Sequence, residues 1–94
     1  GSSDYPLDVD AIKVMNLKPK HSVQYEKKEI ILRISGSVAE IYKLDSKNIK
    51  ASIDLTGYDV GSYTVPVNVE LPEGCVLLEP ATVSIHIKEG AEKE

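Results

Sequence analysis

The sequence predicts a mainly β domain with one short helix. Apolar and polar residues alternate through residues 49–56 and again through 62–71, and a segment bounded by glycines separates the two runs. Successive side chains of a strand point to opposite faces, so each run predicts a long strand with one buried and one solvated face. A third alternation over residues 83–88 predicts the last strand.

The length of the chain predicts one domain, which we expect to span residues 9–89. With 94 residues, a division in two would leave pieces too small to bury a core. Val, Ile and Leu dominate the apolar residues, while Phe and Trp are absent, so the core is expected to be aliphatic. Residues 1–8 are predicted to be a flexible segment that starts with a cloning remnant at Gly1-Ser2. Residues 90–94 are predicted to be a flexible, charged tail.

The first half of the domain predicts short strands separated by turns. Residues 9–17 are apolar enough for a strand, but the phase of the apolar positions slips. One strand with a bulge and two short strands are both compatible with this pattern. A turn is predicted at residues 19–22 and a strand at 23–25. The charged run 26–29 is predicted to be a solvated turn before a strand at 30–34.

A short helix is predicted from about Val38 to Leu44. Ser37 and Glu40 have the spacing of a capping box, in which each side chain binds a free amide of the first helical turn. Apolar residues follow at helical spacing, and the polar run 45–48 is predicted to end the helix.

The connection between the two long strands has its own chemistry. Gly57 and Gly61 bracket it, and glycine tolerates the positive φ that such loops need. No helix follows these glycines, so they do not form a phosphate-binding loop. Asp54 is placed to accept hydrogen bonds from loop amides. Pro66 has no N–H group, so its strand is predicted to lie at an edge or to bulge there.

Charge and hydropathy exclude several classes of function. The formal net charge is −4, whereas phosphate backbones are bound by clustered Lys and Arg, so no nucleic-acid partner is expected. No apolar run is long enough to cross a bilayer. We expect the isolated domain to be soluble and monomeric.

The histidines and the cysteine do not predict a metal site or a catalytic centre. His21 lies in a polar turn, and His86 falls on the polar face of the last strand. Cys75 follows a glycine and has no base at a recognisable spacing, so it is expected to be a half-buried packing residue. We therefore expect no cofactor, no metal and no enzymatic activity, and the residues alone assign no interaction surface.

The acidic residues are predicted to play local roles. Asp4, Asp8 and Asp10 lack the glycine and the distant glutamate of a calcium loop, so they are expected to form a solvated acidic segment. Asp54 and Asp59 would be a carboxylate pair for acid–base chemistry only if a pocket accompanied them. Turn capping accounts for Asp54 without that assumption.

An ordered series of short motifs resembles the YbbR-like domain family of bacteria. The resemblance covers roughly residues 12–88. An apolar strand closes on a glycine and a later strand ends in Asp-Leu-Thr, followed by Gly-Ser-Tyr, Val-Pro-Val, Leu-Pro and Glu-Pro-Ala-Thr-Val. These motifs lie at residues 30–36, 53–56, 61–63, 65–67, 71–72 and 79–83.

The resemblance implies a particular fold. It implies a crossed, figure-eight-like β domain, similar to the C-terminal domain of the general-stress type of 5S-rRNA-associated ribosomal protein. An immunoglobulin-like sandwich is the alternative, because the strand spacing fits it. Against it, the chain lacks the paired cysteines and the core Trp of antibody-type domains.

The resemblance also implies a function. Members of the family occur as tandem repeats of a protein with one membrane helix, which here would lie outside this sequence, and the repeats sit on the extracytoplasmic face of the bacterial membrane. Such a protein binds the membrane diadenylate cyclase and modulates cyclic di-AMP synthesis. By resemblance, this chain is a non-catalytic protein-interaction module. The alternative is a structural spacer or adhesin-type β-sandwich repeat of a cell-surface protein.

Overall fold

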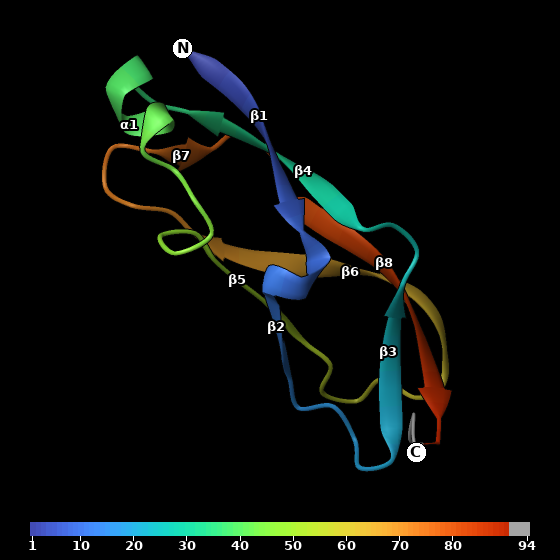
Figure 1. The fold of residues 1–94 in the computed structure, drawn as a ribbon. Coiled ribbons are helices and arrows are strands. Elements are labelled where there is room, and N and C mark those ends of the chain that lie inside the picture. The colour runs from blue at the N-terminus through green and yellow to red at the C-terminus, as the bar shows by residue number, and fades with distance from the viewer. Residues whose placement is uncertain (91–94) are drawn as a thin grey trace.

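This computed structural model describes residues 1–90, in which eight strands form two sheets and one short α-helix accompanies them (Figure 1). The body is elongated, with extents of 45 × 24 × 20 Å. In chain order the elements are β1 (Ser2–Asp8), the 3-10 helix η1 (Val9–Ala11), β2 (Ile12–Met15), β3 (His21–Tyr25), β4 (Glu29–Ser35), α1 (Val38–Tyr42), β5 (Lys50–Asp54), β6 (Gly61–Glu70), β7 (Val76–Leu77) and β8 (Ala81–Glu89).

The topology confirms the predicted fold class. A three-stranded sheet has the order β1-β4-β7, and a five-stranded sheet has the order β2-β5-β6-β8-β3. Every pair is antiparallel except β2 and β5, which run parallel. An immunoglobulin-like sandwich is built from antiparallel sheets, so the parallel pair does not fit that alternative.

β6 and β8 form the longest ladder of the five-stranded sheet. Its register runs from Gly61 opposite Ile87 to Val67 opposite Ala81. The predicted alternation is confirmed on both strands, because one face is buried and the other is exposed or half-buried. The side chains buried on this ladder are Val65, Val67, Ala81, Val83, Ile85 and Ile87.

The core is aliphatic, as predicted, and both sheets contribute to it. β5 and its flanks supply four buried residues in the expected alternation, Ile49, Ala51, Ile53 and Leu55. The remaining buried side chains come from β1, η1, β2, β4 and the segment after α1. They are Leu7, Val9, Ile12, Leu32, Ile34 and Leu44.

The expectation that residues 1–8 are a flexible segment is wrong. Residues Ser2–Asp8 are β1, which pairs with β4 along its whole length, from Ser2 opposite Ser35 to Asp8 opposite Glu29. Leu7 is only 1% exposed. The sequence hides this strand because its inward positions begin with Ser3 and Tyr5 rather than with aliphatic residues. The strand is stabilised by a partner far away along the chain.

The ambiguous segment 9–17 is a 3-10 turn followed by one strand. Asp8 caps η1, and its Oδ1 accepts from the amide of Asp10 at 2.7 Å. The turn explains the slip in phase, because both Val9 and Ile12 reach the core from its two ends. β3 also begins earlier than predicted, at His21, because it pairs with β8 from that residue.

The helix is confirmed but shorter than predicted. Ser37 Oγ accepts from the amide of Glu40 at 3.2 Å, as the capping box requires of its first residue. The helix ends at Tyr42 rather than Leu44. Asp45 Oδ1 accepts from the amides of residues 47 and 48, so it holds a tight turn that replaces further helix.

Two glycines bring the end of β4 against the turn before β7. A Cβ on Gly36 would lie 2.9 Å from the carbonyl oxygen of Gly74 and 3.3 Å from Sγ of Cys75. Gly74 itself has a φ of +95°. This approach of two backbones explains why the apolar strand closes on a glycine.

The end of the described chain is tied to the β2–β3 connection. Gly90 donates its amide to the carbonyl oxygen of Lys20 at 2.7 Å. This hydrogen bond fixes Gly90 to the rest of the domain, so the predicted flexible tail does not begin at Gly90. The rest of that predicted tail, residues 91–94, lies outside the described residues.

Pro66 lies on an interior strand at a place where that strand has only one ladder. On one side it is opposite Thr82 of β8. On the other side, the pairing of β6 with β5 covers only residues 68–70. The prediction of an edge strand is wrong for β6 as a whole, which lies between β5 and β8, but the missing N–H group meets a local edge.

We predict that amide protection alternates along the first half of β6. Because β5 does not reach residues 62–66, only the amides that point toward β8 have a ladder partner. Hydrogen exchange followed by NMR should show fast and slow amides in turn from Ser62 to Val65. Uniformly strong protection of these amides would contradict the one-sided ladder. Asn68, whose amide points to the same side as Pro66 but lies opposite Ser52 of β5, gives an internal comparison.

Candidate functional site

The structure does not bring the two histidines and the cysteine together. His21 and His86 lie on β3 and β8, and His86 Nδ1 is 2.8 Å from Ser62 Oγ. Cys75 precedes β7, which lies at the other end of the molecule from β3 in Figure 1. Within residues 1–90, no three His, Cys, Asp or Glu side chains are close enough to hold a metal ion.

Two residues of β3 each have a buried polar side-chain atom with no hydrogen-bond partner within residues 1–90. These atoms are Nδ1 of His21 and the hydroxyl of Tyr25. Burial, with a smaller effect of the Asp10 carboxylate, raises the pKa of the Tyr25 hydroxyl. Tyr25 therefore stays neutral at neutral pH and acts as a packing residue of the core.

The N-terminal acidic residues have separate local roles. Asp4, on the outer face of β1, lies 3.9 Å from Nε of Arg33 on the neighbouring strand. Asp8 caps η1, whose second residue is Asp10. The three residues are exposed, as predicted, and lie on β1, at the cap of η1 and within η1.

Asp54 connects two loops at the end of the five-stranded sheet. Its Oδ1 accepts from the amide of Thr56 at 3.0 Å and from Oγ1 of Thr56 at 2.7 Å. It also accepts from Nδ2 of Asn16 at 2.9 Å. The predicted turn-capping role is confirmed. The hydrogen bond from the Thr56 side chain, followed by those from Asn16 and from the Thr56 amide, lowers the pKa of Asp54.

Asp59 forms a second connection between the same loops. Its carboxylate pairs with Nζ of Lys18, which lies in the β2–β3 connection. The hydrogen bond and the charge of Lys18 lower the pKa of Asp59. Since both Asp54 and Asp59 have lowered pKa values, neither has the raised value that a general acid needs.

Exposed apolar side chains gather at the opposite end of the molecule. Residues 1–90 contain seven large hydrophobic side chains that are exposed, and five of them lie on or beside α1, β4 and β7. Val38 and Tyr42, one helical turn apart on α1, are 83% and 90% exposed. The other three are Ile31, Val76 and Leu78. We call these five residues the apolar end.

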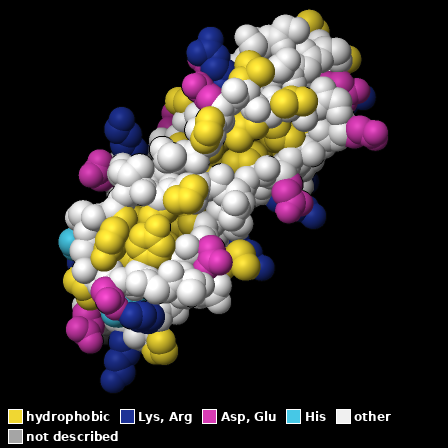
Figure 2. All heavy atoms as spheres, turned by 180° about the vertical axis from the view of Figure 1, so that it is seen from behind, with side chains coloured by type: hydrophobic (Ala, Val, Ile, Leu, Met, Phe, Trp, Pro, Cys, Tyr) yellow, Lys and Arg dark blue, Asp and Glu magenta, His cyan; other side chains and the backbone are white. Residues whose placement is uncertain are grey.

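The apolar end includes the outer face of the three-stranded sheet. Ile31 on β4 lies opposite Pro6 on β1, and the next outward pair along these strands is Arg33 with Asp4. Figure 2 shows hydrophobic side chains gathered in patches on one face of the molecule, one of them toward the end that carries α1. Aliphatic and aromatic side chains around an arginine are typical of protein–protein interfaces.

The sequence contained part of this information. The helical spacing of Val38 and Tyr42 was visible, but periodicity does not say whether a helical face is buried. Ile30 and Ile31 are consecutive, so one of them had to leave the core of a one-sided sheet. That one is Ile31, which is 58% exposed.

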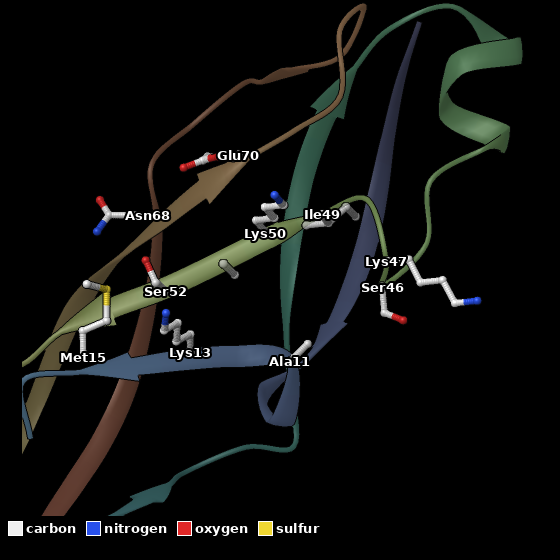
Figure 3. Close-up of a pocket in the computed structure, with 11 residues that line it drawn as sticks. Ala11, Lys13, Met15, Ser46, Lys47, Ile49, Lys50, Ser52, Asn68 and Glu70 are labelled. Atoms are coloured by element: carbon white, nitrogen blue, oxygen red, sulfur yellow. The ribbon is translucent and has the colours of Figure 1, made fainter.

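A hollow with a mixed polar and apolar lining lies beside β2 and β5, and we call it the lysine hollow. It has a volume of about 430 Å³. Figure 3 shows Lys13, Lys50, Ser52, Asn68 and Glu70 on the strands, with Ser46 and Lys47 on the segment before β5. The hollow is also lined by Ala11, Met15, Ile49 and Ala51.

The comparison of sequences identifies a family. A family model described as YbbR-like protein matches residues 8–87, which is most of the chain. No curated protein sequence matches significantly.

The comparison of structures identifies related folds. A YbbR-like domain from Listeria monocytogenes is 16% identical, with a TM-score of 0.67 over 100% of this chain and 99% of that one. Domain IV of a YbbR family protein from Desulfitobacterium hafniense is 27% identical, with a TM-score of 0.66 over 88% and 84% of the two chains. The likeness to the ribosomal protein domain stays a prediction.

A longer relative shows how much of a protein such a domain can occupy. A YbbR-like protein from Streptococcus pneumoniae is 18% identical and has a TM-score of 0.69 over 95% of this chain. The chain spans about half the length of that protein, because the match covers 47% of it.

We predict that Asp54→Asn lowers stability at neutral pH but not in acid. A lowered folded pKa means that the carboxylate stabilises the fold above its ordinary pKa of 3.8, and that this contribution disappears as the pH falls through the folded value. Melting temperatures at about pH 6 and about pH 3 should show the gap between variant and wild type closing. Glu73→Gln removes an exposed charge elsewhere and serves as the control. A gap that is independent of pH would contradict the role of Asp54.

We also predict that zinc and chelators leave the melting temperature unchanged. A metal stabilises a protein only when the folded state holds a site for it, and the two histidines and Cys75 do not converge. Differential scanning fluorimetry with stoichiometric zinc, and separately with EDTA, measures this. A rise with zinc that His21→Ala abolishes would show that a site exists.

Proposed function

This chain belongs to the YbbR-like family, and on that premise we propose that it is a non-catalytic protein-interaction module of a membrane-anchored bacterial regulator. In this proposal the full protein carries several such repeats on the extracytoplasmic face of the membrane. It binds the membrane diadenylate cyclase and modulates the synthesis of cyclic di-AMP. The anchor belongs to another part of that protein; within residues 1–90, no helix is long and apolar enough to cross a membrane.

The relatives support the idea of a repeat. The Streptococcus pneumoniae protein is about twice as long as the part that matches this chain. The Desulfitobacterium hafniense structure is described as domain IV of its protein. A chain that forms one complete domain fits the role of one unit in such an array.

The apolar end is the observation that carries the proposal. A soluble domain that acts only as a spacer gains nothing from exposing Val38 and Tyr42 almost completely. Their exposure on α1 provides the aromatic and aliphatic anchors that a protein partner would bury, and Ile31 is exposed on β4, the strand that leads to α1. A single repeat buries little surface, so binding by the whole array is expected to be much stronger.

The placement of the candidate catalytic residues agrees with a role without chemistry. Cys75 packs beside Gly36, and His86 contacts a serine hydroxyl on the exposed face of the five-stranded sheet. Asp54 and Asp59 are engaged in holding loops. The proposal therefore assigns the function to surfaces.

We predict that substitutions at the apolar end weaken binding to the cyclase. In the full-length protein, Val38→Ser together with Tyr42→Ser should reduce the amount of membrane diadenylate cyclase that coprecipitates by about tenfold, because buried anchors dominate interface energies. Val60→Ser is a matched control, since Val60 is also exposed but lies outside the apolar end.

Two results would overturn parts of the proposal. If the variant and the control retain equal amounts of cyclase, the apolar end is not the binding surface. If the wild-type full-length protein does not retain the cyclase and proves to be anchored to the cell wall, the structural spacer or adhesin-type repeat replaces the regulator.

A further inference from the structure

We propose that the lysine hollow binds the carboxylates of an extended, acidic protein segment. This goes beyond the proposed function, because it adds a second surface that shares no residue with the apolar end and states the chemistry of what binds there. It does not depend on the identity of the partner.

The charge of the hollow is opposite to that of the molecule. The chain has 15 acidic and 11 basic residues, yet Lys13, Lys47 and Lys50 line the hollow with a single acid, Glu70. The ion pairs within residues 1–90 use Lys18 and Arg33, so these three lysines have no ion-pair partner there. Glu70 lies opposite Lys50 across β5 and β6 and offsets one of these charges, so the lining keeps a net positive charge in one concave region, which favours an anion.

The strands place two of the lysines on one side of the sheet. Lys13 on β2 lies beside Ser52 of β5, and Ser52 lies opposite Asn68 of β6. Lys50 is two residues before Ser52 and so shares its face. Figure 3 shows Lys13 and Lys50 over the strands with Ser52 and Asn68 to one side of them, whereas the Lys47 side chain extends away from this group. Ammonium, hydroxyl and amide groups all donate hydrogen bonds to carboxylate oxygens.

The shape of the hollow favours a peptide over a phosphate group. Neither a glycine-rich loop nor the start of α1 lines it, so no cradle of backbone amides is present. Instead it adjoins β2, which is an edge strand of the five-stranded sheet. A segment added along that edge would place alternate side chains on the face of Lys13 and Met15. Acidic residues at those alternate positions would meet the lysines.

An NMR titration tests this with the 94-residue chain. The probe is an acetylated and amidated hexapeptide of alternating Glu and Thr, with a Lys and Thr hexapeptide as its charge-reversed counterpart. We expect the acidic peptide to shift the amide resonances of residues 12–15 and 50–54. We expect the basic peptide to leave them in place, and high salt to remove the effect.

A pair of double variants separates the hollow from general charge. Lys13→Glu with Lys50→Glu should weaken binding of the acidic peptide about fivefold or more, whereas Lys28→Glu with Lys88→Glu, two exposed lysines elsewhere, should change it much less. Equal weakening by both pairs, or no shifts with the acidic peptide, would overturn the proposal. Shifts of the same residues with pyrophosphate but not with the peptide would assign the hollow to a phosphate ligand instead. None of these outcomes bears on cyclase binding through the apolar end.

Discussion

The ladder between β6 and β8 is the constraint on which the rest of the structure depends. It joins seven residue pairs across the middle of the five-stranded sheet and supplies the continuous aliphatic face on which the other elements pack. β5 extends the sheet by pairing with residues 68–70 of β6, and β3 extends it by pairing with residues 85–89 of β8. Pro66 is compatible with this arrangement because the β5 ladder stops before it.

The two aspartates that were candidates for acid–base chemistry, Asp54 and Asp59, stabilise one end of the five-stranded sheet. The connection from β2 to β3 is short, yet these strands are the two edges of the five-stranded sheet, so the sheet must curl. Asn16 and Lys20 accommodate the tight path with positive φ angles of 61° and 69°. Asp54 and Asp59 then connect this segment to the β5–β6 loop through Asn16 and Lys18. Both carboxylates are therefore engaged in hydrogen bonds or an ion pair.

The surfaces divide into an apolar region and a basic region at different places. The apolar end is built on α1, β4 and β7, and the lysine hollow is built on β2 and β5. Burial of apolar side chains gives affinity, and charge complementarity adds specificity and speed of association. A repeat with both kinds of surface can contact a partner or a neighbouring segment in more than one way.

The sequence by itself determined the alternating strands, the aliphatic core, the helix cap at Ser37, the turn at Asp54 and the family, because these depend on residues close together along the chain. Only the tertiary structure decided that residues 2–8 form β1, that β2 runs parallel to β5, and that Ile31, Val38 and Tyr42 stay exposed. The lysine hollow likewise combines residues 13, 47 and 50 across a parallel pair. Such features depend on which distant segments become neighbours, and local periodicity carries no information about that pairing.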